Sequence, residues 1–181
     1  MNKIKKIMHE MKWGLMVEVY KRFIKKNSKI LDVGAGDLYI SKLMQERFDS
    51  KVVGVDVMGY STDFIEYHII KNSKLPFRNN SFDVVTFNTV LHHINFKEQK
   101  EILKEARRVG KRIIIFEDNK DFISYFLDLA LNRWSMDLPL THRKVRDWIK
   151  LFESLNLKVK HIKVKKPFYY PIRHHIFVAY N

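Results

Sequence analysis

The residues best suited to specific chemistry form a glycine turn and an aspartate that follows it along the chain. Gly34 and Gly36 come directly after the apolar run 29–33, and Asp56 ends the next apolar run, 51–56. Glycines lack Cβ atoms and let backbone amides approach a ligand, while the helix after such a turn directs its N-terminus at that ligand. An acidic side chain at the end of a second strand can accept hydrogen bonds from both hydroxyls of a ribose. The spacing therefore predicts a nucleoside-binding site.

The residues after the turn narrow the class of nucleoside. The third glycine of a dinucleotide-binding fingerprint is missing, because Tyr39 stands five residues after Gly34. This departure disfavours nicotinamide and flavin cofactors, because their pyrophosphate must approach the backbone closely. The turn is not followed by the lysine and hydroxyl residue of a P-loop, so ATP binding by that route is disfavoured as well. A nucleoside cofactor without a pyrophosphate fits the pattern.

Further motifs follow in a fixed order. They are Ile-Leu-Asp-Val-Gly-Ala-Gly at 30–36, Val-Gly-Val-Asp at 53–56, Leu-Pro-Phe at 75–77, Ser-Phe-Asp-Val-Val at 81–85 and Val-Leu-His-His-Ile at 90–94. Together they resemble class I S-adenosylmethionine-dependent methyltransferases of the small-molecule type, similar to those of ubiquinone and menaquinone biosynthesis. The resemblance is clear over residues 28–118. It implies S-adenosyl-L-methionine as the cofactor and S-adenosylhomocysteine as the product.

The resemblance also assigns residues to parts of the cofactor. Asp32, Gly34 and Gly36 are expected to surround the methionine part. Asp56 is expected to bind the ribose. Asn88, at the end of the fourth strand, is expected to offer its backbone to the amino group.

The adenine end of the site departs from the family. Val57 and Met58 are expected to lie beside the adenine. Lys71 occupies a position where the family often has an aspartate that bonds the adenine amino group, and a lysine cannot accept a hydrogen bond. Asn72 is a candidate substitute through its amide oxygen, so the contact to the adenine stays open.

Catalysis of methyl transfer needs mainly an acceptor placed in line with the methyl group, and a base only where the acceptor must lose a proton. His92 and His93 follow the fourth strand, and a histidine can accept a proton at neutral pH. The alternative is that one histidine packs in the core and the other caps a turn. Glu117 and Asp118 end the fifth strand, where open α/β sheets place ligands, unless they form a capping or solvated pair.

Aromatic residues are candidates for the acceptor pocket, with core packing as the alternative; they are Tyr125, Phe126, Trp134, Phe168, Tyr169 and Tyr170. A metal site is not expected. His161, His174 and His175 are possible metal ligands, but no carboxylates accompany them at the spacing of a metal site.

Apolar strands that alternate with helical segments predict an α/β fold with a mostly parallel sheet covered on both faces. The predicted strands are 29–33, 51–56, 67–70, 82–87, 111–116, 158–164 and 175–180. The predicted helices are 2–26, 38–48, 96–109, 121–134 and 141–155. The family resemblance implies a Rossmann-like three-layer sandwich with strand order 3-2-1-4-5-7-6 and the last strand antiparallel.

The chain is expected to form a single domain over residues 1–181, with an N-terminal helical segment, 1–27, before the Rossmann-like core, 28–181. Apolar residues recur along that first helix at steps of three and four, so they form a stripe that is expected to pack against another surface. They are Ile4, Ile7, Met8, Met11 and Leu15. In similar enzymes the N-terminal segment covers the cofactor and acceptor cleft, and the same is expected here.

Composition sets outer limits on the function. The chain has 181 residues, of which 46% are hydrophobic, and it has no cysteine, which excludes disulfides, thiolate metal sites and cysteine nucleophiles. Its apolar runs are shorter than the roughly 20 residues that span a bilayer, and its N-terminus lacks the apolar stretch of a signal peptide. A cytoplasmic protein is therefore expected.

The net charge of +14 belongs to the two ends of the chain. Residues 1–27 carry eight basic and two acidic side chains, and residues 141–181 carry ten and two. Such basic flanks attract phosphate, nucleic acid or an acidic membrane surface, or they form solvated helix faces and a protected sheet edge.

Three functions stay open. The first is methyl transfer to a small-molecule acceptor. The second is an RNA methyltransferase that holds the phosphate backbone with its basic flanks. The third is a non-catalytic subunit that binds S-adenosylmethionine.

Overall fold

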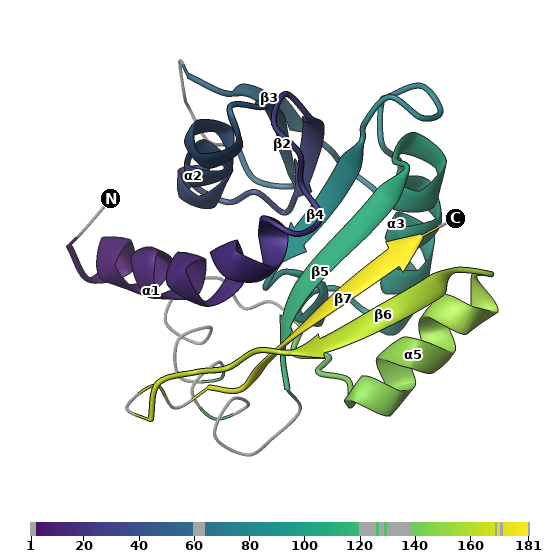
Figure 1. The fold of residues 1–181 in the computed structure, drawn as a ribbon. Coiled ribbons are helices and arrows are strands. Elements are labelled where there is room, and N and C mark those ends of the chain that lie inside the picture. Colours follow the sequence, from purple (N-terminus) through teal and green to yellow (C-terminus); the bar gives the residue numbers. More distant parts are fainter. Residues whose placement is uncertain are drawn as a thin grey trace.

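The protein forms one twisted sheet with helices on both faces (Figure 1). The structure, a computed structural model, describes residues 3–59, 64–119, 126, 129, 139–168, 170 and 172–180. Its strands are β1 (Lys29–Val33), β2 (Lys51–Asp56), β3 (Glu66–Ile69), β4 (Val84–Asn88), β5 (Arg112–Asp118), β6 (Lys158–Lys163) and β7 (His174–Tyr180). Its helices are α1 (Lys3–Tyr20), α2 (Tyr39–Phe48), the 3₁₀ turn η1 (Leu91–His93), α3 (Phe96–Val109) and α5 (Val145–Ser154).

The order of the strands is β3-β2-β1-β4-β5-β7-β6, which confirms the predicted topology. Neighbouring strands from β3 to β5 run parallel, and β7 runs antiparallel to both β5 and β6. The central strands are buried along almost their whole length, as their continuous apolar sequences require for a sheet covered on both faces. The carboxyl ends of β1, β2, β4 and β5 therefore meet at one edge of the sheet.

Two apolar layers hold the helices on the sheet. On one face, Leu103 of α3 and Phe152 of α5 pack with side chains such as Val85 and Ile115. On the other, α1 and α2 pack against the alternate side chains of the same strands. Because successive strand residues point to opposite faces, one apolar run such as β5 supplies both layers.

Helix α1 differs from its prediction in its length and in its buried face. It ends at Tyr20, and residues 21–24 continue it only as a hydrogen-bonded turn. Ile7, Met8 and Met11, expected to be covered, are 46%, 38% and 37% exposed. Burial is concentrated in the second half of the helix, where Met16 and Tyr20 enter the core. Of the predicted apolar stripe, Leu15 packs against the core, whereas Ile7, Met8 and Met11 remain exposed.

Other predicted boundaries shift by a few residues. The strand predicted at 82–87 begins at Val84, and the helix predicted at 141–155 begins at Val145. The helix predicted at 121–134 falls almost entirely outside the described residues, although Phe126 and Leu129 are helical. Within the part of the chain that the structure describes, no helix is both long and apolar enough to cross a membrane.

Candidate active site

A cavity of about 490 Å³ opens at the carboxyl ends of the parallel strands, within the usual size of a small-ligand site. Its wall includes every residue predicted to bind the cofactor: Asp32, Gly34, Gly36, Asp56, Val57, Met58, Asn72 and Asn88. Residues from α1 complete one side, at the positions Lys5, His9, Lys12 and Met16. The strand ends thus bring together side chains that are far apart in the sequence.

The two glycines of the turn are required for different reasons. Both have positive φ angles, 69° at Gly34 and 54° at Gly36, which other residues adopt only with strain. A Cβ atom at Gly34 would lie 2.1 Å from Cγ2 of Val90, so this turn packs directly on the loop after β4. A Cβ atom at Gly36 would meet nothing within 4 Å among the described atoms, so this turn borders open space.

Leu38, two residues after Gly36, also has a left-handed conformation, with φ at 64°. Its side chain is fully buried, and its Cδ2 atom lies 2.5 Å from where a Cβ atom at Gly54 would be. A glycine in β2 therefore makes room for the leucine.

Asp32 has a buried carboxyl group at the end of β1. It accepts hydrogen bonds from Ser41 Oγ (2.6 Å), Thr86 Oγ1 (2.9 Å) and Asn88 Nδ2 (2.8 Å). Burial raises the pKa of Asp32 to about 6, because these hydrogen bonds only partly offset the loss of water. The cavity therefore has an acidic group that a positively charged ligand would hold in its ionised form.

Asp56 ends β2 and is tied to the glycine turn. Its Oδ2 atom accepts a hydrogen bond from Gly36 N at 2.8 Å, and its Oδ1 atom accepts one from Met58 N at 3.1 Å. Each carboxylate oxygen has a second lone pair. The carboxylate is thus held in a fixed orientation and keeps the capacity to accept hydroxyl groups of a sugar.

The expected adenine side of the cavity is open. Val57 and Met58 are 64% and 44% exposed and line the wall together with Lys71 and Asn72. The Oδ1 atom of Asn72 accepts a hydrogen bond from Lys74 N at 3.0 Å, which closes a local turn. The predicted contact of this amide with an adenine stays a prediction.

The two candidate histidines have different surroundings. His93 lines the cavity. His92 is 3% exposed, lies behind the wall, and its Nδ1 atom is 2.5 Å from Oε2 of Glu117. Glu117 also accepts hydrogen bonds from Val90 N and Leu91 N at the start of η1, so it caps this turn and is not solvated. The structure brings only His93 to the place where an acceptor could be deprotonated.

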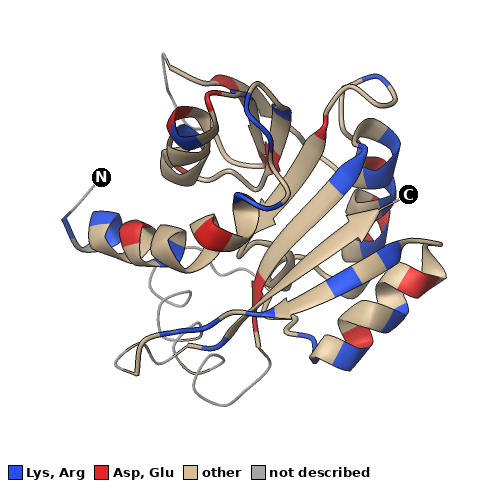
Figure 2. Cartoon of the chain, viewed as in Figure 1, with Lys and Arg blue, Asp and Glu red and all other residues tan. Residues whose placement is uncertain are grey.

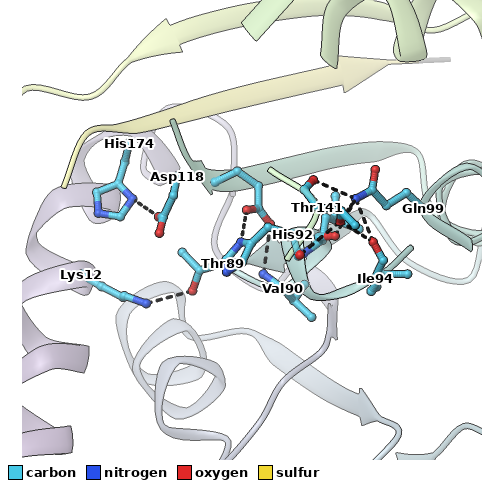
Figure 3. Close-up of polar contacts among 11 residues, drawn as sticks. Lys12, Thr89, Val90, His92, Ile94, Gln99, Asp118, Thr141 and His174 are labelled. Carbon is cyan, nitrogen blue, oxygen red and sulfur yellow. Dashed lines mark hydrogen bonds and ion pairs between the residues drawn. The ribbon is translucent and has the colours of Figure 1, made fainter. Parts of the chain in front are cut away.

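Gln99 anchors the loop after β4, and the sequence analysis missed it. The residue is fully buried, and its Nε2 atom donates to Leu91 O (2.8 Å), Ile94 O (3.0 Å) and Thr141 Oγ1 (2.8 Å). Figure 3 shows these contacts converging on one amide. The available signal was a polar residue on the inward face of α3, three positions before Ile102.

A second group of polar residues lies at the end of β5. The Nδ1 atom of His174 is 2.6 Å from Oδ1 of the buried Asp118, and the Nε2 atom of His174 is 2.9 Å from the hydroxyl of Tyr170 (Figure 3 shows the His174–Asp118 pair). Burial by itself raises the pKa of Asp118, but the ion-pair contact with His174 and the nearby charges of His92 and Lys12 hold it well below its usual value. Of the alternatives left open for Asp118, the structure excludes a solvated side chain, because Asp118 is buried and paired with His174.

The aromatic residues proposed for the acceptor pocket do not line the cavity where the structure describes them. Phe126 and Phe168 are exposed, and Tyr170 is buried against His174. Tyr125, Trp134 and Tyr169 lie outside the described residues.

The histidines considered for a metal site pair with other groups. The Nε2 atom of His161 is 2.8 Å from Nδ1 of His175, while His174 contacts Asp118. No group of three metal-ligating side chains occurs among the described residues.

Comparisons with known proteins agree with this geometry. Residues 31–113 match the family described as methyltransferase domain. A structure of an S-adenosylmethionine-dependent methyltransferase from Aquifex aeolicus is similar, with a TM-score of 0.73, 20% identity, and coverage of 98% of this chain and 96% of the other. A search of curated proteins found no match to the sequence.

Two further structures are similar in fold. One is the complex between the Haloferax volcanii Trm112 methyltransferase activator and the putative methyltransferase, with a TM-score of 0.78, 13% identity, and coverage of 97% of this chain and 91% of the other. The other is the Burkholderia thailandensis 1,6-didemethyltoxoflavin-N1-methyltransferase with its substrate and S-adenosylhomocysteine bound, with a TM-score of 0.69, 15% identity, and coverage of 96% and 77%. Residues 31–113 therefore match the methyltransferase domain family, and the chain as a whole has the fold of the class I S-adenosylmethionine-dependent methyltransferases.

Proposed function

We propose that the protein transfers a methyl group from S-adenosylmethionine to a small-molecule acceptor. The observation that carries this proposal is the single cavity whose wall contains the glycine turn, Asp32, Asp56 and Asn88 together. These residues come from three strands and match the cofactor positions that the family motifs imply. A site of this size accommodates a nucleoside cofactor beside a small acceptor.

The residues present fit the cofactor chemically. The open space beside Gly36 gives a ligand access to backbone amides. The buried carboxyl group of Asp32 suits a positively charged amino group, and the oriented carboxylate of Asp56 suits ribose hydroxyls. When bound, S-adenosylmethionine supplies a methyl group that is already activated by its sulfonium. The protein then has to hold the acceptor in line and keep water out.

His93 is the candidate base for an acceptor that must lose a proton. It lies on the cavity wall, and the turn η1 that carries it is fixed by Glu117 and Gln99. A base that is held by buried hydrogen bonds keeps a defined distance from the reacting atom. An acceptor that is already nucleophilic would not need this group.

The lysines of the C-terminal flank do not favour RNA as the acceptor, whereas the N-terminal flank contributes Lys5 and Lys12 to the cavity wall. Figure 2 shows the lysines of the C-terminal flank along β6, which is the end strand of the sheet. These lysines do not line the cavity. They would therefore not guide a bound RNA into the site in the way that the RNA hypothesis needs.

Replacement of Asp56 tests the cofactor assignment. Deleting a charged hydrogen-bond acceptor costs about 1.5–3 kcal/mol, so Asp56→Ala should weaken S-adenosylhomocysteine binding by about ten- to a hundredfold in calorimetry. The exposed Glu153 provides the control, since Glu153→Ala removes the same charge on α5, away from the cavity. Equal affinity of Asp56→Ala and wild type would refute the ribose assignment.

Incubation with a labelled methyl donor tests the class of acceptor. The extract is separated into metabolite, lipid and RNA fractions, and label is expected in the metabolite fraction. Label in RNA would establish the RNA methyltransferase instead. Tight cofactor binding without label in any fraction would support a non-catalytic subunit.

A further inference from the structure

The side of the cavity formed by α1 is basic. Lys5, His9, Lys12 and Met16 line it, at steps of three and four residues, and therefore share one face of the helix. This face differs from the apolar stripe that the sequence suggested as the covered one. Three of its four members are able to carry positive charge.

The charges on this face are not compensated equally. Lys5 Nζ is 3.0 Å from Oδ2 of Asp37, and His9 Nε2 is 3.3 Å from the same atom. The ammonium group of Lys12 instead donates to the neutral hydroxyl of Thr89, at 3.0 Å (Figure 3). Within the described residues Lys12 forms no ion pair. A partly buried ammonium with a neutral partner favours an anion nearby, because its loss of water is not offset by an opposite charge in direct contact.

Thr89 directly follows Asn88, the last residue of β4, and has an uncommon backbone conformation. Its φ angle is 53°, although a β-branched side chain disfavours the left-handed region. Its amide donates to Phe116 O of β5 at 2.7 Å, which holds the conformation in place. Strained residues of this kind persist mainly at functional sites. The hydroxyl that Lys12 contacts is therefore in a fixed position on the cavity wall.

The ammonium of Lys12 contacts the cavity wall at Thr89, between Asn88 and the turn η1. Most of the predicted cofactor residues are at the ends of β1 and β2 and after β3, and Asn88 is the one that lies at the end of β4, directly before Thr89. Burial raises the pKa of Asp118, at the end of β5, but Lys12 lies close enough to this carboxyl group to help His174 and His92 lower it. This part of the wall also carries His93, the candidate base.

We propose that the methyl acceptor carries an anionic group, a carboxylate or a phosphate, that binds the ammonium of Lys12 and the hydroxyl of Thr89. This inference rests on the proposed methyltransferase function and names the class of its substrate. The acidic residues on the wall have other partners or are exposed: Asp37 is paired and Glu98 is exposed. Asp32 receives three hydrogen bonds, and Asp56 accepts two from backbone amides at the end of β2. Binding of the anion beside η1 places the rest of the acceptor near His93.

The first experiment uses inorganic phosphate and acetate as probes for the protein saturated with S-adenosylhomocysteine. At constant ionic strength, one of the two anions is expected to raise the melting temperature, and the more effective one identifies phosphate or carboxylate as the group. Lys12→Gln keeps a hydrogen-bonding group for Thr89 but removes the charge, and should weaken binding of the anion at least tenfold. Lys12→Arg should restore most of it.

Lys6 provides the matched control on the same helix. Its side chain is 56% exposed, it contacts Glu10 and it does not line the cavity, so Lys6→Gln should leave anion binding unchanged. Equal stabilisation by the anion in wild type and Lys12→Gln would overturn the inference, as would no stabilisation by either anion.

The second experiment identifies the charge of the product. Labelled metabolites from the transfer reaction are expected to be retained by an anion exchanger, and Lys12→Gln should raise the KM for the retained acceptor more than it lowers kcat. Label in neutral or cationic compounds would overturn the inference while leaving the methyltransferase proposal intact. A wild-type protein that does not bind S-adenosylhomocysteine would overturn the proposed function itself.

Discussion

The carboxyl group of Asp32 is buried beside the glycine turn and receives three hydrogen bonds, from Ser41, Thr86 and Asn88. Burial raises its pKa to about 6, and the nearby charge of Asp56 adds to the effect. A folded-state pKa above the unfolded value of 3.8 means that the protonated form stabilises the unliganded protein. This stabilisation is fully present below about pH 4 and is lost as the pH rises through about 6.

A positively charged ligand reverses this preference because it stabilises the carboxylate. The affinity for S-adenosylmethionine is therefore expected to be nearly constant above about pH 6 and to fall by up to tenfold for each pH unit below it. Titration calorimetry over this range measures the effect. Asp32→Asn should bind more weakly and show a flat profile between pH 5 and 7; a wild-type profile that is equally flat would contradict the role of Asp32.

At the level of single residues, the sequence predicted residues that line the cavity at the strand ends and missed the contacts of α1 and α3 with the loop after β4. Gly34 and Asp56 could be predicted because they follow strands at fixed distances, and all such strand ends meet at one edge. Lys12 and Thr89 are 77 residues apart, and Gln99 and Thr141 are 42 apart. No spacing rule relates separate segments of this kind, so these contacts became visible only in the folded chain.

Helix α1 is tied to the cofactor site by a chain of buried hydrogen bonds. The hydroxyl of Tyr20 donates to Oδ1 of Asn88 at 2.6 Å, and Nδ2 of Asn88 donates to Asp32 at 2.8 Å. Burial raises the pKa of Tyr20 well above its usual value, so the hydroxyl stays protonated and acts as the donor. The tyrosine thereby fixes which way the amide of Asn88 points.

Tyr20→Phe should disrupt this chain with little change in volume. Leaving the buried oxygen of Asn88 without its donor costs about 1–3 kcal/mol in the free energy of unfolding. With Asn88 released, Asp32 loses part of its hydrogen bonding, so the pH below which cofactor binding weakens should move upward. Denaturant unfolding and the pH profile of binding measure the two effects.

The same substitution at Tyr39 is the control for this chain. The hydroxyl of Tyr39 donates to Glu10 at an exposed position, 3.0 Å away, and does not line the cavity. Tyr39→Phe should change the free energy of unfolding by no more than a few tenths of a kcal/mol. It should also leave the pH profile of cofactor binding in place. If Tyr20→Phe lowers stability but leaves the pH profile in place, Tyr20 has only a structural role.

At the level of elements, periodicity predicted that α1 is helical but misled about its packing. Apolar spacing identifies a face, whereas burial depends on where the neighbouring elements end. Met16 and Tyr20 lie over the sheet and α2, while Ile7 and Met11 lie in the half of the helix whose other face borders the cavity. The strands were predicted more accurately. The central strands are covered on both faces, so their side chains are buried whichever face they point to.

The whole molecule combines a neutral centre with basic ends. In Figure 2 the C-terminal lysines follow β6, the outermost strand beside β7. The family topology predicted this position, but the sequence alone did not separate edge protection from RNA binding. An edge strand exposes unpaired backbone groups, and charged side chains there oppose pairing with another chain. Lys158, Lys160 and Lys163 are all exposed, as this role requires.

Replacing Lys158, Lys160 and Lys163 with serine should therefore increase self-association, measured by analytical ultracentrifugation, and leave cofactor binding unchanged. A triple variant on α3 removes the same charge from a helix face, where no strand edge is exposed; its substitutions are Lys97→Ser, Lys100→Ser and Lys104→Ser. This control should stay as monodisperse as the wild type. If the β6 variant instead remains unassociated and loses an RNA affinity that falls steeply with salt, the lysines serve to bind nucleic acid, because edge protection predicts association without any such partner.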